Sequence, residues 1–140
     1  MAKRVLVVDD HAPTRLLIRA ILEADGQYDV VEAATGVECL KAHANRGPID
    51  LVLLDVVLPD LDGFQVCRSL RSVDDKVPIV FVTAKGELKD HAAGRAAGGD
   101  SYIVKPITKG TLRALASLFT SVDRSVHGGS GAPAEQRPRS

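Results

Sequence analysis

The sequence has 140 residues, 45% of them hydrophobic and 26% charged, which is typical of one globular domain with enough interior for a core. Its formal net charge is zero, which argues against nucleic acid or an anionic membrane surface as the partner. No apolar stretch approaches the ~20 residues that cross a bilayer, and the first residues lead into a strand-like run instead of a signal peptide, so we expect a cytoplasmic protein. Cys39 and Cys67 lack metal-ligand spacing and are expected to be free thiols.

The first predicted strand covers residues 5–8, a continuous apolar run that ends at Asp9 and Asp10. Pro13 suits the first turn of the helix that follows, and Gly26 ends it. We expect Leu17, Ile18, Ile21 and Leu22 on its inner face, and Arg15, Arg19 and Glu23 in solvent.

Residues 28–33 mix apolar side chains with acids at positions 29 and 32, a pattern that favours an edge strand. Thr35 can cap the next helix, which Gly47 and Pro48 end. On this helix we expect Val37, Leu40 and Ala44 to face inward.

Residues 51–54 are four consecutive large apolar residues that run directly into Asp55, which indicates a central strand of a parallel sheet. A loop marked by Pro59 and Gly63 follows, then a third helix. One face of that helix carries Phe64, Cys67 and Leu70. The strand would hold Asp55 at its carboxyl end, where parallel sheets place their chemistry.

Residues 78–82 form another buried-type strand, which ends at Thr83 and Ala84. The helix expected at 88–97 is a poor one, because its apolar side is nearly all alanine and Gly94 costs about 1 kcal/mol relative to alanine. A short strand at 102–104 ends at Lys105. The last helix carries Leu112, Leu115, Phe119 and Val122 on its apolar face.

Five alternations of strand and helix predict an α/β fold, a doubly wound parallel sheet with helices on both faces. The apolar periodicity stops after residue 122. We therefore assign residues 1–122 to the domain and expect 123–140, which contain Gly128-Gly129-Ser130-Gly131, to be a flexible, disordered tail.

Polar side chains stand at four of the predicted strand ends: Asp9, Asp10, Asp55, Thr83 and Lys105. Carboxylates gathered there would repel one another and need a cation, and oxygen ligands suit Mg²⁺. Lysine and a threonine hydroxyl suit a phosphoryl group, and an aspartate carboxylate can carry one. Each residue also has an ordinary explanation as a helix cap, a strand end or a solvated lysine. Together they favour phosphoryl transfer with Asp55 as nucleophile.

The chain resembles the receiver domain of two-component response regulators. The resemblance rests on Val8-Asp9-Asp10-His11, Leu54-Asp55 with Leu58-Pro59 and Asp62-Gly63, Val82-Thr83-Ala84, and Tyr102 with Val104-Lys105-Pro106, and it extends over residues 3 to about 122. It implies a flavodoxin-like (βα)5 sandwich whose five parallel strands have the order 2-1-3-4-5.

The resemblance also implies the roles of the site residues. Asp55 would accept a phosphoryl group from a histidine kinase or a histidine phosphotransfer protein. Asp10, Asp55 and the backbone carbonyl of Val57 would bind Mg²⁺ directly, and Asp9 largely through water. Thr83 and Lys105 would contact the phosphoryl group. Tyr102 matches the aromatic switch residue, which turns inward as Thr83 moves toward the phosphate, although it could also be an ordinary half-exposed aromatic on an edge strand.

Three alternatives belong to other classes of protein. A pseudo-receiver would bind proteins without being phosphorylated. A phosphatase of the haloacid dehalogenase type needs a second acid where this sequence has Val57. A flavodoxin needs a phosphate-binding loop where this sequence has Asp9-Asp10-His11. We expect a signalling domain and not an enzyme, either a stand-alone receiver or a fragment of a larger regulator, with no direct nucleic-acid or membrane binding and a downstream protein target that the sequence does not name.

Overall fold

The computed structural model describes residues 2–121, so the tail expected at 123–140 and the inward position expected for Val122 lie outside the described residues. Five strands form one parallel sheet in the order β2-β1-β3-β4-β5, as the resemblance implied. The strands are β1 (Lys3–Val8), β2 (Tyr28–Ala33), β3 (Leu51–Leu54), β4 (Ile79–Thr83) and β5 (Ser101–Val104). The expected edge position of residues 28–33 is confirmed.

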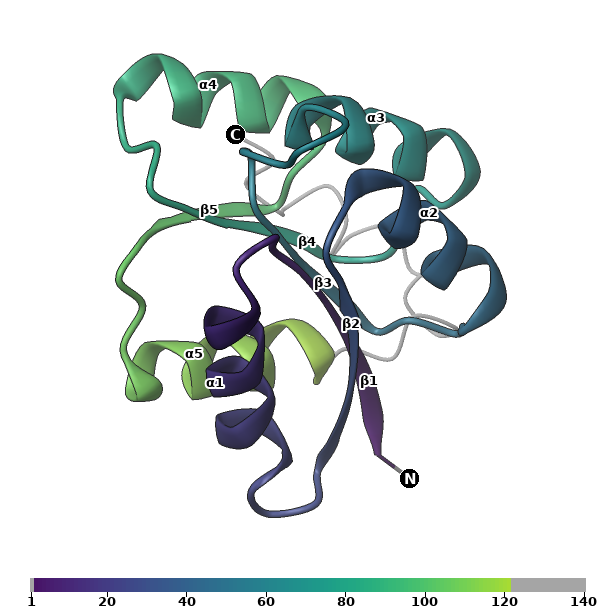
Figure 1. Cartoon of the computed structure of the whole chain (residues 1–140), viewed down its shortest axis with the longest axis vertical. Helices are drawn as coiled ribbons and strands as arrows, with labels where there is room; N and C mark the ends of the chain where they lie inside the picture. Colours follow the sequence, from purple (N-terminus) through teal and green to yellow (C-terminus); the bar gives the residue numbers. More distant parts are fainter. Residues whose placement is uncertain (1, 122–140) are drawn as a thin grey trace.

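Five helices alternate with the strands: α1 (Ala12–Glu23), α2 (Gly36–Asn45), α3 (Gly63–Val73), α4 (Leu88–Ala97) and α5 (Lys109–Thr120). Helices α1 and α5 cover one face of the sheet, and α2, α3 and α4 cover the other (Figure 1). None of the helices that the structure describes is long and apolar enough to cross a membrane.

Alternate residues of each central strand enter two separate cores, since successive side chains of a strand point to opposite faces. Val5 and Val7 of β1 pack with the buried residues of α1 and α5. Leu6 and Val8 pack with those of α2 and α3. All four β3 residues are at most 1% exposed. The strand that leads to Asp55 is therefore held rigidly from both sides.

The inner face of α1 is narrower than the sequence suggested. Ile18 and Leu22 are buried, but Leu17 is 60% exposed, so its expected inward position is wrong. Ile18 and Leu22 are four residues apart and share one stripe, while Leu17 lies beside it at the rim of a cavity of about 370 Å³. Arg15 does not face solvent as expected, because its side chain forms an ion pair with Glu32 at 2.9 Å and is only 16% exposed.

Helix α2 also turns a different face inward. Val37 and Ala44 are exposed, which contradicts the prediction, and only Leu40 of the three expected residues packs against the core. The buried stripe is instead Gly36 and Cys39, extended by Leu40 and by His43, which pairs with Asp74. This stripe follows the i, i+3, i+4, i+7 spacing, but glycine, cysteine and histidine do not stand out as core residues in a sequence.

Neither of the two cysteines forms a disulfide, as their spacing suggested, and both are fully buried. Burial and the nearby Cys67 thiol raise the pKa of Cys39 to about 12. A thiol with so high a pKa is a poor nucleophile and metal ligand at neutral pH.

Candidate functional site

Asp9 and Asp55 lie side by side because the strands that precede them are neighbours. Val8 of β1 is in register with Leu54 of β3. The backbone N–H of Asp55 donates to Val8 O at 3.0 Å, which continues the ladder to the acid. The two acids are 3% and 6% exposed. The expected meeting of these acids at the carboxyl ends of their strands is thus found in the structure.

The Lys105 ammonium bridges the two buried carboxylates. Its Nζ donates to Asp9 Oδ2 at 2.6 Å and to Asp55 Oδ2 at 2.9 Å. Burial lowers the pKa of Lys105, but the hydrogen bonds and charges of the two carboxylates outweigh it and leave the pKa above its usual value. Lys105 therefore remains protonated and supplies a fixed positive charge beside Asp55.

The remaining carboxylate oxygens are held by the backbone of the following turns. His11 N donates to Asp9 Oδ1 at 2.9 Å, and Val57 N donates to Asp55 Oδ1 at 3.1 Å. The Asp55 carboxylate is therefore held at one oxygen by the loop that follows it and at the other by Lys105.

Asp10 differs from its neighbour Asp9, because it is exposed and forms no hydrogen bond or ion pair with the other described residues. Among residues 2–121 no three His, Cys, Asp or Glu side chains are arranged to hold a metal ion, and the Lys105 ammonium bridges Asp9 and Asp55 instead. The three carboxylates and one ammonium still leave two negative charges. Oxygen ligands with that charge fit Mg²⁺, with Asp10 free to bind it.

Thr83 and Tyr102 are connected through the backbone of Lys85. Thr83 is fully buried, and its Oγ1 accepts from Lys85 N at 3.3 Å. Tyr102 donates from its hydroxyl to Lys85 O at 2.6 Å. Burial and the charges of Asp90 and Asp55 raise the pKa of Tyr102 to about 12, so the hydroxyl keeps its proton. A movement of the loop after β4 would therefore reach both side chains.

Sequence reasoning missed the role of Asp60 in the loop after Asp55. Asp60 Oδ1 accepts from Gly36 N at 2.8 Å and Oδ2 accepts from Val37 N at 3.0 Å, so this loop caps the start of α2. These backbone N–H groups hold the pKa of Asp60 below its usual value. The sequence shows Asp60 only as one acid in a turn, with nothing to indicate the distant helix.

The contacts of Arg15 were also not predicted from the sequence. Its Nη1 donates to the backbone O of Asp9 at 2.6 Å, while its Nε donates to Glu32 Oε1 at 2.9 Å. Arg15 thus ties the Asp9 turn to the edge strand β2. The only sequence signal is the pair of acids at positions 29 and 32, which indicated an edge strand and not an ion pair.

Close packing leaves no room for a side chain at Gly63, where the loop after Asp55 enters α3. A Cβ at Gly63 would lie 2.6 Å from Val56 Cα and would overlap the carbonyl of Asp55. Asp62 caps α3 through its contact with Phe64 N at 2.7 Å. The loop from Asp55 to α3 is therefore compact at both ends.

Comparison with known proteins identifies the fold and the relatives of the chain. Residues 5–117 match the family described as response regulator receiver domain. The chain is 46% identical over 106 residues to response regulator MprA of Mycobacterium sp. (strain KMS), a match that covers 76% of this chain and 45% of that protein. It is 44% identical over 108 residues to the alkaline phosphatase synthesis transcriptional regulatory protein PhoP of Bacillus subtilis (strain 168), covering 77% and 44%.

The chain thus spans about half the length of the curated relatives that it matches. Among solved structures, a CheY-like response regulator receiver domain protein from Methanospirillum hungatei JF-1 has a TM-score of 0.83 and 29% identity, covering 91% of this chain and 100% of that one. Sequence, strand order and structural similarity agree, and the chain belongs to the response regulator receiver domain family.

Proposed function

We propose that the protein is a phosphorylation-activated switch that accepts a phosphoryl group on Asp55 from a histidine kinase or a histidine phosphotransfer protein. The observation that carries the proposal is the position of Asp55 at the end of the buried strand β3, 2.9 Å from the Lys105 ammonium and beside Asp9. A carboxylate fixed next to a protonated lysine is suited to phosphoryl transfer, where positioning and charge stabilisation do most of the catalysis.

In the proposed step, a carboxylate oxygen of Asp55 forms a P–O bond while the P–N bond of the donor phosphohistidine breaks. The electron pair of the broken bond stays on the donor imidazole nitrogen. Lys105 remains protonated and stabilises the negative charge that develops on the phosphoryl oxygens. The Thr83 hydroxyl donates a hydrogen bond to the same group once the loop after β4 moves.

Mg²⁺ fits this site as a cofactor because of the residual charge and the oxygen ligands. Asp10, Asp55 and the backbone carbonyl of Val57 would hold the ion directly, and Asp9 through water. When bound, Mg²⁺ offsets the charge shared by the carboxylates and the phosphoryl oxygens. Lys105 would then be released from part of its contact with Asp9 and Asp55.

The output of the switch would be a changed protein-binding surface near Tyr102, formed by α4, β5 and α5. Thr83 and Tyr102 both contact Lys85, so a change at Asp55 that draws in Thr83 moves the support of Tyr102 as well. The relative PhoP, of which this chain spans 44%, is named as a transcriptional regulatory protein, and a receiver that controls such a regulator would act through a protein surface of this kind. The partner would bind this surface differently in the two forms.

Incubation with a small phosphodonor, with and without Mg²⁺, tests the proposal. We expect intact mass spectrometry to show one added phosphoryl group in the wild type with Mg²⁺ and none in Asp55→Asn. Equal labelling of the two proteins would contradict the assignment. A truncation after residue 122 should be labelled as the full chain is, if residues 1–122 hold the whole function.

A further inference from the structure

Four aromatic rings follow one another in a row of pairwise contacts from α3 to α4. Phe64 of α3 meets Phe81 of β4 at 5.3 Å between ring centroids, and Phe81 meets Tyr102 of β5 at 5.7 Å. His91 of α4 completes the row at 4.3 Å from Tyr102, with 36° between the rings. The chain has only three phenylalanines and two tyrosines, so this aromatic row gathers most of its aromatic side chains.

Helix α4 lies close to the aromatic row because its residues there are small. A Cβ at Gly94 would be 2.9 Å from Tyr102 Cδ2 and 3.1 Å from Phe81 Cδ2. The buried residues of α4 are Asp90, Gly94 and Ala97, and Leu88, its largest apolar residue, is 87% exposed. The helix therefore places one ring on Tyr102, that of His91.

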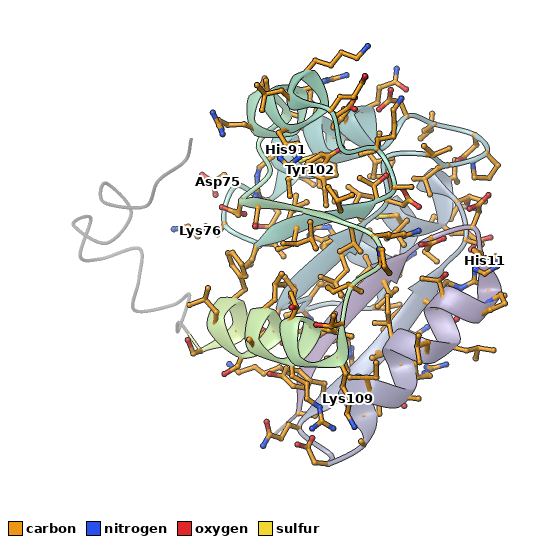
Figure 2. All side chains as sticks on the ribbon, turned by 90° about the vertical axis from the view of Figure 1, so that its left-hand side faces the viewer. His11, Asp75, Lys76, His91, Tyr102 and Lys109 are labelled. Atoms are coloured by element: carbon orange, nitrogen blue, oxygen red, sulfur yellow. The ribbon has the colours of Figure 1, made fainter. Side chains whose placement is uncertain are left out.

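Figure 2 shows His91 and Tyr102 next to each other where α4 meets β5. Two contacts fix the Tyr102 side chain at its exposed side. The Tyr102 hydroxyl donates to Lys85 O at 2.6 Å, and the His91 ring lies against the Tyr102 ring. Phe81 lies on the inner side. Loss of the His91 ring would leave Tyr102 held by the hydrogen bond to Lys85, the contact with Phe81 and the close approach of α4 at Gly94.

We propose that His91 is a positioning residue that holds Tyr102 where the structure has it, with its hydroxyl on Lys85 O and its ring against Phe81, and thereby sets the resting balance of the switch; we call this position the inward place. The inference rests on the proposed function, because it takes the inward place of Tyr102 as the one that the phosphorylated form uses. An interaction present in only one of two arrangements shifts their equilibrium by its own free energy. A stacked aromatic pair corresponds to roughly a three- to tenfold shift.

The shortage of aromatic residues makes Tyr102 accessible to a direct probe. The chain has two tyrosines and no tryptophan, so Tyr28→Phe leaves Tyr102 as the single tyrosine. When this variant is labelled with 3-fluorotyrosine, every ¹⁹F NMR signal comes from Tyr102. In this background we compare His91→Ala, His91→Phe and, as the matched control on the same helix, Lys89→Ala. The Lys89 side chain is 79% exposed and forms only a surface pair with Glu87 at 3.4 Å.

Without any activating ligand, we expect the ¹⁹F chemical shift of Tyr102 in His91→Ala to differ from that of the parent protein. In His91→Phe and in Lys89→Ala it should equal the parent value. The return in His91→Phe separates loss of the ring from a general loosening of α4. A His91→Ala signal that equals the parent signal would overturn the proposal, and so would a Lys89→Ala shift as large as that of His91→Ala. None of these readings requires phosphorylation.

Titration with beryllofluoride and Mg²⁺ then connects the effect to the switch. We expect His91→Ala to need more beryllofluoride for half-saturation than the parent, since binding must first restore the inward place of Tyr102. The increase is at most roughly three- to tenfold, and it reaches the full factor when the inward place is the minor one. Equal or tighter binding by His91→Ala would overturn the role in the switch. Failure of Asp55 labelling in the wild type would instead refute the proposed function, which keeps the two failures distinguishable.

Discussion

Replacing Gly94 with alanine should destabilise the protein, although alanine is the better helix former. Gly94 is buried in α4 against the rings of Tyr102 and Phe81. A Cβ there would be 2.9 Å from Tyr102 Cδ2 and 3.1 and 3.2 Å from Phe81 Cδ2 and Cε2, so at least one ring would have to move. In a packed core such movement is costly.

The expected change is a balance of two effects. Alanine in place of glycine within a helix contributes about 1 kcal/mol of stability. Overpacking of a well-packed site costs about 1–3 kcal/mol. We therefore expect Gly94→Ala to lower the free energy of unfolding by about 0–2 kcal/mol. Gly110→Ala in α5 is the matched control, because nothing lies within 4 Å of its added Cβ.

Urea denaturation followed by circular dichroism measures both variants. Gly110 lies in the first turn of α5, where alanine gains at most what it gains at Gly94. The difference between the two variants is therefore a lower limit on the overpacking, and we expect it to favour Gly110→Ala by up to about 3 kcal/mol. In a domain of this size, 1 kcal/mol corresponds to a shift in Tm of roughly 4 °C. If Gly94→Ala proves as stable as Gly110→Ala, α4 does not lie on the rings of Tyr102 and Phe81, and the packing argument is wrong.

Three further predictions concern the charged residues. Lys105→Met should bind Mg²⁺ more tightly, because a competing positive charge is lost, yet accept a phosphoryl group about 100-fold more slowly. The control Lys109→Met, at an exposed position, should change neither property, and slower transfer together with weaker Mg²⁺ binding in Lys105→Met would contradict the prediction. Calorimetric titration of Asp10→Ala should show a greater loss of Mg²⁺ affinity than that of Asp9→Ala, and the reverse order would exchange their roles. Asp60→Asn should be less stable than the wild type at pH 7, because the native contacts of Asp60 favour its ionised form. The denaturation curves of the two proteins should converge as the pH falls through the pKa of Asp60, which lies below its usual 3.8; a difference in stability that stays the same at every pH would rule out this cap.

The strands and the strand-end residues could be predicted because they depend on short, local patterns. Each central strand is a continuous apolar run, and the acid or lysine directly after it must lie at the same edge of a parallel sheet. That reasoning placed Asp9 and Asp55 beside Lys105, where the structure has them. The helix at 88–97 was also predicted with its observed bounds.

The inner faces of the helices were harder to predict because they depend on tertiary neighbours. Leu17 and Val37 are apolar but exposed. Gly36 is buried, and α3 packs so close to it that an added Cβ would lie 2.8 Å from Val66 Cγ2. The shortage of large residues in α4, a weakness by helix propensity, is explained by the rings of Phe81 and Tyr102 that occupy the space. A single sequence does not encode which rings will lie under which helix.

Contacts between residues far apart in the sequence were missed for the same reason. Asp60 is 24 residues from Gly36, and Arg15 is 17 residues from Glu32, so no local pattern connects them. Only the three-dimensional arrangement shows that the loop after Asp55 caps α2 and that the Asp9 turn is tied to β2.

The most direct test of Asp55 as the phosphoacceptor is to locate the phosphoryl group chemically. The wild-type protein is phosphorylated with a small phosphodonor and Mg²⁺, reduced with borohydride, which converts an aspartyl phosphate to homoserine, digested and mapped by mass spectrometry. We expect homoserine at position 55 and at no other aspartate, with none formed when the donor is omitted. Homoserine at Asp9 or Asp10, or its absence from position 55 in a protein that carries phosphate, would contradict the claim that Asp55 is the phosphoacceptor.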